Sequence, residues 1–137
     1  MIETTDNPQV DATPTGLTRG ALLVEDEPLV AMLTEDNLRD LGFEPVWVAT
    51  AAEALKFLRS DAALVLAVID VGLPDMRGDD LARRIRRDRP ELGVILATGH
   101  DAVSLRAGFG DDERTVVLAK PYLAADLARS AQAVAGD

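Results

Sequence analysis

Five polar side chains follow short apolar runs of the sequence, and together they could do chemistry. They are three carboxylates, a hydroxyl and an amine, namely Glu25, Asp26, Asp70, Thr98 and Lys120. Charged side chains avoid protein interiors, so their places one or two residues beyond apolar runs indicate a task other than packing. If the runs are strands of one parallel sheet, these side chains meet beyond its carboxyl edge, where ligands collect in such folds.

The three carboxylates predict a divalent cation. Crowded carboxylates raise one another's pKa and repel, which costs stability unless a cation lies between them. Mg²⁺ prefers a few oxygen ligands together with waters and phosphate oxygens. We therefore predict an Mg²⁺ site formed by Asp26, Asp70 and a backbone carbonyl near Gly72, with Glu25 acting through water.

A carboxylate in such a pocket can act as a nucleophile. Once a metal neutralises the pocket, one of its carboxylates can attack a phosphoryl group and form an aspartyl phosphate. The Thr98 hydroxyl and the Lys120 ammonium can then bind oxygens of the transferred group, where negative charge accumulates. We predict that one of these carboxylates accepts a phosphoryl group and that Thr98 and Lys120 assist it.

Each of these residues also has a purely structural interpretation. Glu25 and Asp26 could cap the helix that follows them, since carboxylates are favoured at helix N-termini. Asp70 and Thr98 could be turn residues close to glycines, and Lys120 could be a surface lysine. All of these explanations would have to hold together at one edge of one sheet, so the combination favours a functional site.

The hydrophobic pattern locates the elements that must position these side chains. Apolar, β-branched runs predict five strands, at residues 21–24, 45–48, 64–69, 94–97 and 115–118. Segments of helical period lie between the strands and after the last one. The predicted helices run from Pro28 to a stop at Gly42, from Thr50 over a capping box with Glu53, from Gly78 to Asp88, from Ala102 to Gly108, and onward from Pro121.

Strict alternation of five strands and five helices predicts the fold class. Joined by right-handed crossovers, they form an α/β doubly wound (βα)5 fold of three layers, with a five-stranded parallel sheet in strand order 2-1-3-4-5. We expect the inward faces of the first and last helices to be formed by Val30, Leu33 and Leu41, and by Leu123, Leu127, Ala131 and Val134.

Length and composition allow one folded domain. The chain has 137 residues, of which 47% are hydrophobic, enough for a single core. Residues 1–19 show no hydrophobic period, so we expect a disordered arm ahead of a domain over residues 20–137. The absence of cysteine excludes disulfides and thiolate sites. No apolar stretch approaches the length of a membrane span, and we expect a cytoplasmic protein without membrane contacts.

Charge argues against nucleic-acid binding. The formal net charge is −10, which repels phosphate backbones. An arginine cluster between residues 83 and 89 is the local exception. Because Leu81 and Ile85 supply an inward helix face there, we expect these arginines on a solvated face and no direct nucleic-acid partner.

The sequence resembles the CheY-like receiver domains of bacterial two-component response regulators, from about Gly20 to Val134. The matching motifs are Leu-Val-Glu-Asp-Glu at 23–27, Ile-Asp-Val-Gly-Leu-Pro-Asp-Met-Arg-Gly at 69–78, Ala-Thr-Gly at 97–99 and Ala-Lys-Pro-Tyr at 119–122. The resemblance implies a flavodoxin-like fold and a phosphoryl donor that is a histidine kinase or a histidine phosphotransfer protein. It also implies Asp70 as the phosphoacceptor, Thr98 as the switch hydroxyl and Lys120 as a phosphate contact, with a cis bond from Lys120 to Pro121.

Val117 departs from the common pattern of that family. Common receivers carry Tyr or Phe three residues before the lysine, and that position is Val117 here. The stretch 94–100 resembles instead the atypical receivers with Phe-Ala-Thr-Gly, which lack the switch aromatic and have a short or mobile fourth helix. Leu96 and His100 stand where those receivers have Phe and an aromatic. His100 is either a gate or pH sensor at the pocket or a plain loop residue.

The resemblance implies a stand-alone phosphoacceptor, because the chain stops at Asp137 without an output domain. We expect it to catalyse only its own phosphorylation and dephosphorylation, and to signal by protein contacts or serve as a phosphate sink. One alternative is a degenerate receiver that only binds proteins, which the intact polar set disfavours. The other is a phosphatase resembling haloacid dehalogenases, whose nucleophile is followed by an acid at plus two, where this chain has Gly72.

Overall fold

Five parallel strands form one sheet in the computed structural model, which describes residues 19–60 and 63–135. The order across the sheet is β3-β2-β4-β5-β6, which is 2-1-3-4-5 counted along the chain, as predicted. Each strand begins and ends within two residues of its predicted bounds. The strands are β2 (Arg19–Val24), β3 (Phe43–Val48), β4 (Leu64–Asp70), β5 (Gly93–Thr98) and β6 (Thr115–Ala119).

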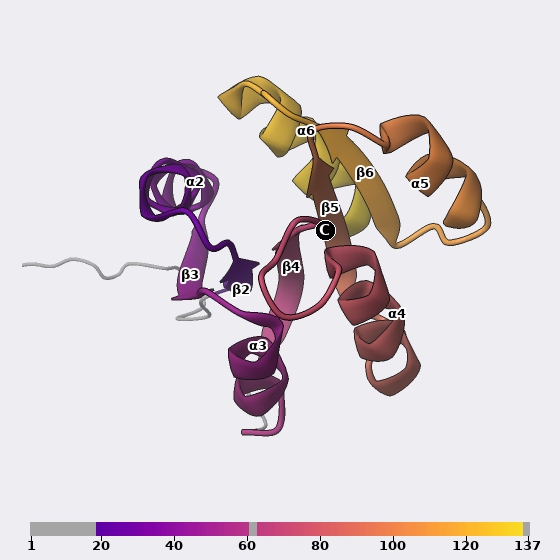
Figure 1. Cartoon of the computed structure of the whole chain (residues 1–137). Helices are drawn as coiled ribbons and strands as arrows, with labels where there is room; N and C mark the ends of the chain where they lie inside the picture. Colours follow the sequence, from indigo (N-terminus) through magenta and orange to yellow (C-terminus); the bar gives the residue numbers. More distant parts are fainter. Residues whose placement is uncertain (1–18, 61–62, 136–137) are drawn as a thin grey trace, which may run out of the picture.

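Helices cover both faces of this sheet. They are α2 (Pro28–Asp40), α3 (Ala51–Leu58), α4 (Gly78–Asp88), α5 (Ala102–Gly108) and α6 (Ala124–Ala135). Helices α2 and α6 lie on one face and α3, α4 and α5 on the other, as Figure 1 shows in a view onto the carboxyl ends of the strands. The result is the three-layer doubly wound α/β fold that the alternating pattern predicts.

The sheet separates two apolar cores, one on each of its faces. Leu22 and Val24 of β2 pack in the core under α3, α4 and α5. Leu23, between them, points to the core under α2 and α6, because successive side chains of a strand face opposite sides. Strand β5 is buried along its whole length, as expected of a central parallel strand covered by helices on both faces.

Local signals end and begin the helices where the sequence predicts. Gly42 follows α2 with a φ of 93°, a left-handed conformation that glycine adopts without strain. The Thr50 hydroxyl accepts a hydrogen bond from the Glu53 N–H at 3.1 Å and caps α3. The Glu53 carboxylate in turn accepts from the N–H of Ala49 at 2.9 Å, which completes a capping box one residue wider than the usual form.

The inward face of α2 differs from the prediction. Its buried residues are Ala31, Thr34 and Leu38, whereas Leu33 is 61% exposed. Small side chains at positions 31 and 34 let the helix lie close to the sheet. The bulky Leu33 therefore stays on the outer side, and its placement in the core was wrong.

The start of α6 also differs from the prediction for one residue. Leu127, Ala131 and Val134 are buried as expected, but Leu123 is 73% exposed. The Leu123 N–H donates to the Asp126 carboxylate at 2.9 Å, which holds Leu123 ahead of the first helical turn. The helix consequently begins at Ala124, and Leu123 lies outside the apolar stripe.

The arginine cluster of α4 is solvated only in part. Arg83, Arg84 and Arg87 are exposed, as predicted. Arg86 is not on a solvated face, because its guanidinium donates to the Asp112 carboxylate at 2.9 Å and to the backbone carbonyl of Leu92 at 2.6 Å. It also contacts the Thr115 hydroxyl at 2.9 Å, so one arginine ties α4 to β5 and β6.

Two predictions concern the N-terminal arm and membranes. Of the predicted arm, residues 1–18 lie outside the described residues, and Arg19 is the first residue of β2. Across the residues that the structure describes, every helix is too short or too polar to cross a membrane.

Candidate functional site

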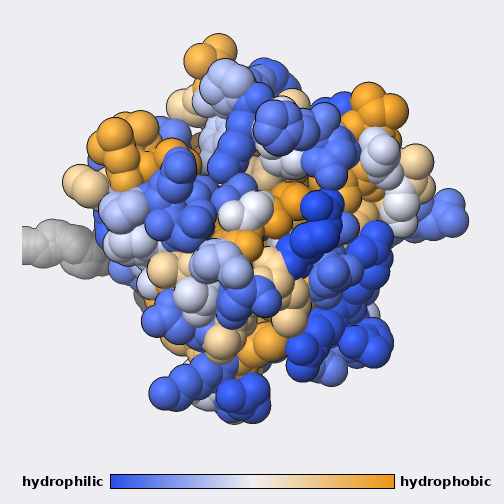
Figure 2. Space-filling view, in the orientation of Figure 1, coloured by the Kyte–Doolittle hydropathy of each residue, from blue (hydrophilic) through white to orange (hydrophobic). Residues whose placement is uncertain are grey.

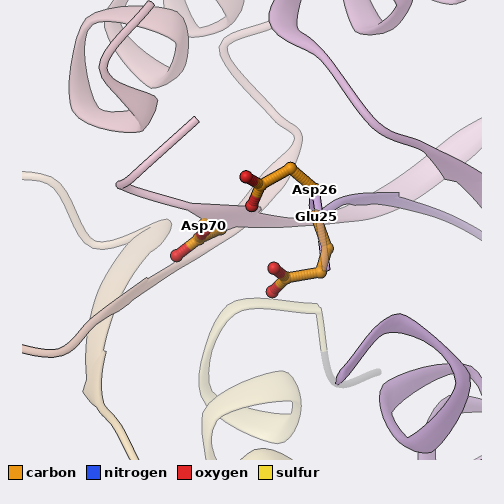
Figure 3. A group of neighbouring side chains, drawn as sticks. All are labelled: Glu25, Asp26 and Asp70. Atoms are coloured by element: carbon orange, nitrogen blue, oxygen red, sulfur yellow. The ribbon is translucent and has the colours of Figure 1, made fainter. Parts of the chain in front are cut away.

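Three carboxylates come together at the carboxyl ends of neighbouring strands. Glu25 and Asp26 directly follow β2, and Asp70 is the last residue of β4. Val24 is in register with Ile69, so both strand ends deliver their acids at the same level. One oxygen of each carboxylate lies within 4.8 Å of the others, and Figure 3 shows the three side chains around one shared space.

Burial makes this acidic cluster electrostatically costly. Glu25 is 3% exposed and Asp70 is 8% exposed, whereas Asp26 is exposed. The pKa of Glu25 is raised above its usual value, first by burial and then by the charge of Asp70. A hydrogen bond from the Glu27 N–H to the Glu25 carboxylate, at 3.2 Å, offsets part of this effect.

Lys120 supplies the positive charge nearest to two of these acids. Its ammonium lies 2.9 Å from an oxygen of Asp70 and 3.6 Å from an oxygen of Glu25. Burial alone would lower the pKa of Lys120, but the bond to Asp70 and the charge of Glu25 outweigh burial and raise it. The side chain is therefore charged at neutral pH. The bond from Lys120 to Pro121 is cis, as the family resemblance implies.

Thr98 lies at the same edge, but its hydroxyl is turned to another partner. It is the last residue of β5 and is 3% exposed. Ala97, directly before it, is in register with Asp70. The Thr98 hydroxyl donates to the carboxylate of Asp101 at 2.9 Å. The structure thus brings Thr98 to the predicted edge and commits its one O–H donor to a residue that the sequence did not single out.

Gly72 and His100 border the site on two loops. Gly72 follows Asp70 in an exposed turn, and an added Cβ would stand 3.9 Å from an oxygen of the Asp70 carboxylate. His100 is exposed, and its backbone N–H lies 3.4 Å from the Thr98 hydroxyl oxygen. A gating or pH-sensing task of its imidazole stays a prediction.

Sequence reasoning missed the polar residues that hold the surrounding loops. The Asp75 carboxylate accepts hydrogen bonds from the backbone N–H groups of Ala51 and Ala52, at 2.9 and 3.0 Å. It thereby fastens the loop after β4 to the start of α3, and these bonds lower the pKa of Asp75. Arg77 of the same loop pairs with Asp101 at 3.0 Å. These partners are 24 residues apart in the chain, so no local pattern indicates them.

The only tryptophan of the sequence is also joined to the site. Trp47 of β3 is 37% exposed, and its indole N–H donates to the backbone carbonyl of Glu25 at 2.6 Å. It therefore supports the strand end that carries two of the acids. This agrees with a structural task for Trp47, in addition to its contacts within the sheet.

The residues present fit a hard divalent cation and an anionic ligand. Three carboxylates offer the oxygen donors that Mg²⁺ prefers, and two of them are too buried to be solvated fully by water. The Lys120 ammonium lies against Asp70 and close to Glu25, where it can also bind an anionic oxygen. The site can therefore hold a cation and a phosphoryl group next to the same carboxylate.

Comparison with known proteins agrees with this geometry. The family model of the response regulator receiver domain matches residues 21–132. The chain is 37% identical to the probable transcriptional regulatory protein TcrX of Mycobacterium tuberculosis over 106 residues, which are 74% of this chain and 43% of that protein. It is also 37% identical to the sensor protein TorS of Escherichia coli over 79 residues, 58% of this chain and 9% of that protein.

Solved structures show the same fold. The signal receiver domain of a LuxO repressor protein from Vibrio parahaemolyticus superposes with a TM-score of 0.74 at 31% identity, covering 83% of this chain and 87% of that one. A CheY-like receiver domain protein from Methanospirillum hungatei gives a TM-score of 0.76 at 26% identity, covering 85% and 92%.

The matches define a shared domain, since the chain spans less than half the length of both of these curated relatives. The family model covers nearly all of the residues that form the sheet and its helices, and it includes every member of the acidic cluster. The chain belongs to the family of response regulator receiver domains.

Proposed function

We propose that Asp70 accepts a phosphoryl group from the phosphohistidine of a histidine kinase or a histidine phosphotransfer protein, in an Mg²⁺-dependent reaction. The observation that carries this proposal is the setting of Asp70. Its buried carboxylate lies 2.9 Å from the Lys120 ammonium and within 4.8 Å of two further carboxylates. A nucleophile, a cation site and an anion contact are thus neighbours.

The cation would be held by residues of this chain alone. Asp26, Asp70 and the backbone carbonyl of Gly72 are the proposed ligands, with Glu25 acting through water. When bound, Mg²⁺ would neutralise the acids and bind an oxygen of the incoming phosphoryl group. Lys120 would bind a second oxygen and Thr98 a third, which distributes the charge of the group over three contacts.

In the proposed transfer, one bond to phosphorus forms while another breaks. An oxygen of the Asp70 carboxylate forms a bond to phosphorus, while the bond from phosphorus to the imidazole nitrogen of the donor breaks. The electron pair of that bond stays on the nitrogen, which takes up a proton. In the later hydrolysis, the oxygen of a water molecule forms a bond to phosphorus and the bond from phosphorus to the Asp70 oxygen breaks. Inorganic phosphate leaves and the Asp70 carboxylate is restored, so the chain turns over only its own phosphoryl group.

An apolar surface next to Lys120 supports a protein as the donor. Leu29, Met32 and Leu33 of α2 are more than half exposed, and Figure 2 shows apolar side chains gathered over this helix. A groove of about 530 Å³ lies between α2 and residues 120–122, and we call it the α2 groove. An occupant of the α2 groove would lie against Lys120, which contacts Asp70. We propose that the phosphodonor protein binds there.

The signal would leave the domain through contacts with other proteins, or the domain would act as a phosphate sink. Receiver domains are signalling modules, and we propose no separate substrate for this one. Cytoplasmic placement, action without an attached output domain and membership of the Phe-Ala-Thr-Gly type stay predictions. A purely protein-binding receiver is disfavoured because all of the polar residues of the set are present.

Labelling by a small phosphodonor tests the proposal. We expect acetyl phosphate with Mg²⁺ to add the mass of one phosphoryl group to the wild-type protein, measured by intact-mass spectrometry. Asp70→Asn should take up none, because an amide is not a nucleophile of this kind. The control is Asp88→Asn, an exposed aspartate at the end of α4, which should label like the wild type. Absence of labelling in the wild type at saturating Mg²⁺ would leave only the binding-module alternative.

A further inference from the structure

The Thr98 hydroxyl is bonded to a carboxylate outside the acidic cluster. It is buried and donates its single proton to the Asp101 carboxylate at 2.9 Å. A hydroxyl has one O–H donor, so it cannot donate to a second acceptor at the same time. Asp101 thus competes for the donor that the proposed function assigns to the phosphoryl group on Asp70.

Asp101 is itself held in place from another loop. Its second carboxylate oxygen lies 3.0 Å from the guanidinium of Arg77, which belongs to the loop between β4 and α4. Arg77 also pairs at 3.0 Å with Asp79, a buried residue in the first turn of α4. The bonds from Thr98 and Arg77 lower the pKa of Asp101, so its carboxylate is ionised at neutral pH and accepts strongly.

These contacts form one continuous chain of hydrogen bonds from β5 to α4. It passes through Thr98, Asp101, Arg77 and Asp79. Asp101 stands directly before α5, where it makes no capping hydrogen bond to that helix. Within the described structure, the Asp101 carboxylate bonds to Thr98 and Arg77. It does not cap the N-terminus of α5, as an aspartate at this position usually does.

We propose that Asp101 is a positioning residue that holds the Thr98 hydroxyl away from the phosphoryl site, with Arg77 as its anchor. The inference rests on the proposed function of Asp70. For Thr98 to bind a phosphoryl oxygen, its bond to Asp101 must break, so phosphorylation exchanges one acceptor for another. Asp101 therefore lowers the affinity of the site for a phosphoryl group and sets how readily the domain enters its active state.

The experiment measures the affinity for beryllofluoride, a phosphoryl mimic, by amide NMR spectra at saturating Mg²⁺. Asp101→Ala should bind it roughly ten-fold more tightly than the wild type, the size expected for release of one hydrogen bond to a charged acceptor. Asp101→Asn should gain much less affinity, because its amide oxygen still accepts the hydrogen bond from Thr98. Both variants lose the same charge, so the difference between them reports the hydrogen bond.

A Thr98→Val background separates positioning from a general charge effect. In that background Asp101→Ala should not raise the affinity for beryllofluoride, since no hydroxyl remains to be released. Urea unfolding of each variant verifies that it is folded, which is expected because Asp101 is a partly exposed loop residue.

The inference is overturned if Asp101→Ala binds beryllofluoride no more tightly than the wild type, if Asp101→Asn gains as much, or if the gain persists with Thr98→Val. A wild-type protein that binds none at saturating Mg²⁺ overturns the proposed function and this inference together. Equal binding by the wild type and Asp101→Ala overturns this inference alone.

Discussion

At the scale of single residues, the site is a balance between buried negative charge and one ammonium group. Glu25 and Asp70 are buried within 4.8 Å of each other and of Asp26, and Lys120 contacts two of the three acids. One positive charge does not neutralise three carboxylates. Repulsion between the carboxylates therefore destabilises the folded protein at this point, and a bound cation would reduce this repulsion.

The raised pKa of Glu25 predicts a pH-dependent penalty. Burial, followed by the charge of Asp70, raises this pKa in the folded state, so the folded protein binds the proton more tightly than the unfolded chain. The free energy of unfolding should therefore fall as the pH rises from the usual glutamate pKa through the raised pKa of Glu25. Without Mg²⁺, Glu25→Gln should therefore be more stable than the wild type at neutral pH and should lose this advantage in acid, measured by urea unfolding in EDTA.

Added Mg²⁺ should reverse the order of these two proteins. The wild type should gain more stability from Mg²⁺ than Glu25→Gln, because the full charge of the cluster attracts the cation. The matched control is Glu44→Gln, an exposed glutamate on β3, whose change should alter neither curve. A Glu25→Gln protein that is less stable than the wild type in EDTA at neutral pH would contradict the assignment of Glu25 as a source of this penalty.

The members of the acidic cluster could be predicted from the sequence because they directly follow strands. Once Ala21 to Val24 and Leu64 to Ile69 are identified as parallel strands, the place of the residues after them is given by the sheet. Asp101 and Arg77 could not be predicted in this way. Their positions depend on loop conformations and on a pairing across 24 residues, for which the sequence has no local signal.

At the scale of elements, the loop between β4 and α4 holds other segments around the site in place. Its Asp75 carboxylate caps the start of α3, and its Arg77 holds Asp101. Gly78, at the start of α4, donates its N–H to the backbone carbonyl of Val71 at 2.8 Å and packs against the backbone next to Asp70. The position of Asp70, the proposed phosphoacceptor, thus depends on a close backbone contact.

Gly78 leaves no room for a side chain. A Cβ added there would lie 2.2 Å from the backbone oxygen of Asp70 and 2.7 Å from the Cα of Val71. Gly78→Ala should destabilise the fold by about 1–3 kcal/mol, the usual cost of overpacking, as measured by urea unfolding. It should also slow labelling by acetyl phosphate, because the backbone that carries Asp70 must shift.

Gly99→Ala is the matched control for this prediction. Gly99 follows Thr98, and an added Cβ meets nothing within 4 Å. Its substitution should change the unfolding free energy by less than about 0.5 kcal/mol. If Gly78→Ala is as stable as Gly99→Ala, the close contact with Asp70 does not constrain the loop.

Strand bounds were predictable to within two residues because apolar runs act locally, and Gly42 and the Thr50 cap likewise mark helix ends. Side-chain facing was less predictable. Leu33 and Leu123 match a helical period but lie outside, since the depth of α2 is set by small residues and the start of α6 by the Asp126 carboxylate. The prediction of a solvated face for Arg86 was wrong, because its acceptors lie on the first residue of β6 and in the loops before β5 and β6, which the helical period of α4 does not indicate.

At the scale of the whole molecule, the site lies between two different surfaces. On one side is the α2 groove, with Leu29, Met32 and Leu33 beside it. On the other side are the network of Asp101 and the short helix α5 (Figure 1). The two surfaces suit the two tasks that we propose for this domain, receipt of a phosphoryl group and its readout, and both adjoin the same strand ends.

Binding of the donor protein in the α2 groove makes a specific prediction. Leu33→Ser should slow phosphotransfer from a phosphorylated histidine kinase about ten-fold, as for loss of one apolar anchor of an interface. The kinase used is one shown first to transfer its phosphoryl group to the wild-type protein. Labelling by acetyl phosphate should stay at the wild-type rate, because this small donor needs no docking surface.

Val103→Ser is the control for that experiment. Val103 is 80% exposed on α5, on the opposite side of the site from α2, so its replacement should change neither rate. If Leu33→Ser slows both donors equally, the residue acts on the chemistry or the fold. If it slows neither, the donor protein binds elsewhere.

Trp47 gives the molecule an optical property that follows from one hydrogen bond. Its indole N–H is bonded at 2.6 Å to the backbone of Glu25, whose carboxylate belongs to the acidic cluster, and it is the only tryptophan of the sequence. Emission from an indole responds to its hydrogen bonding and its exposure to water. Tryptophan fluorescence of the chain therefore comes from one indole bonded to the strand end that carries the cluster, and ion or phosphoryl occupancy that shifts Glu25 becomes a spectral signal.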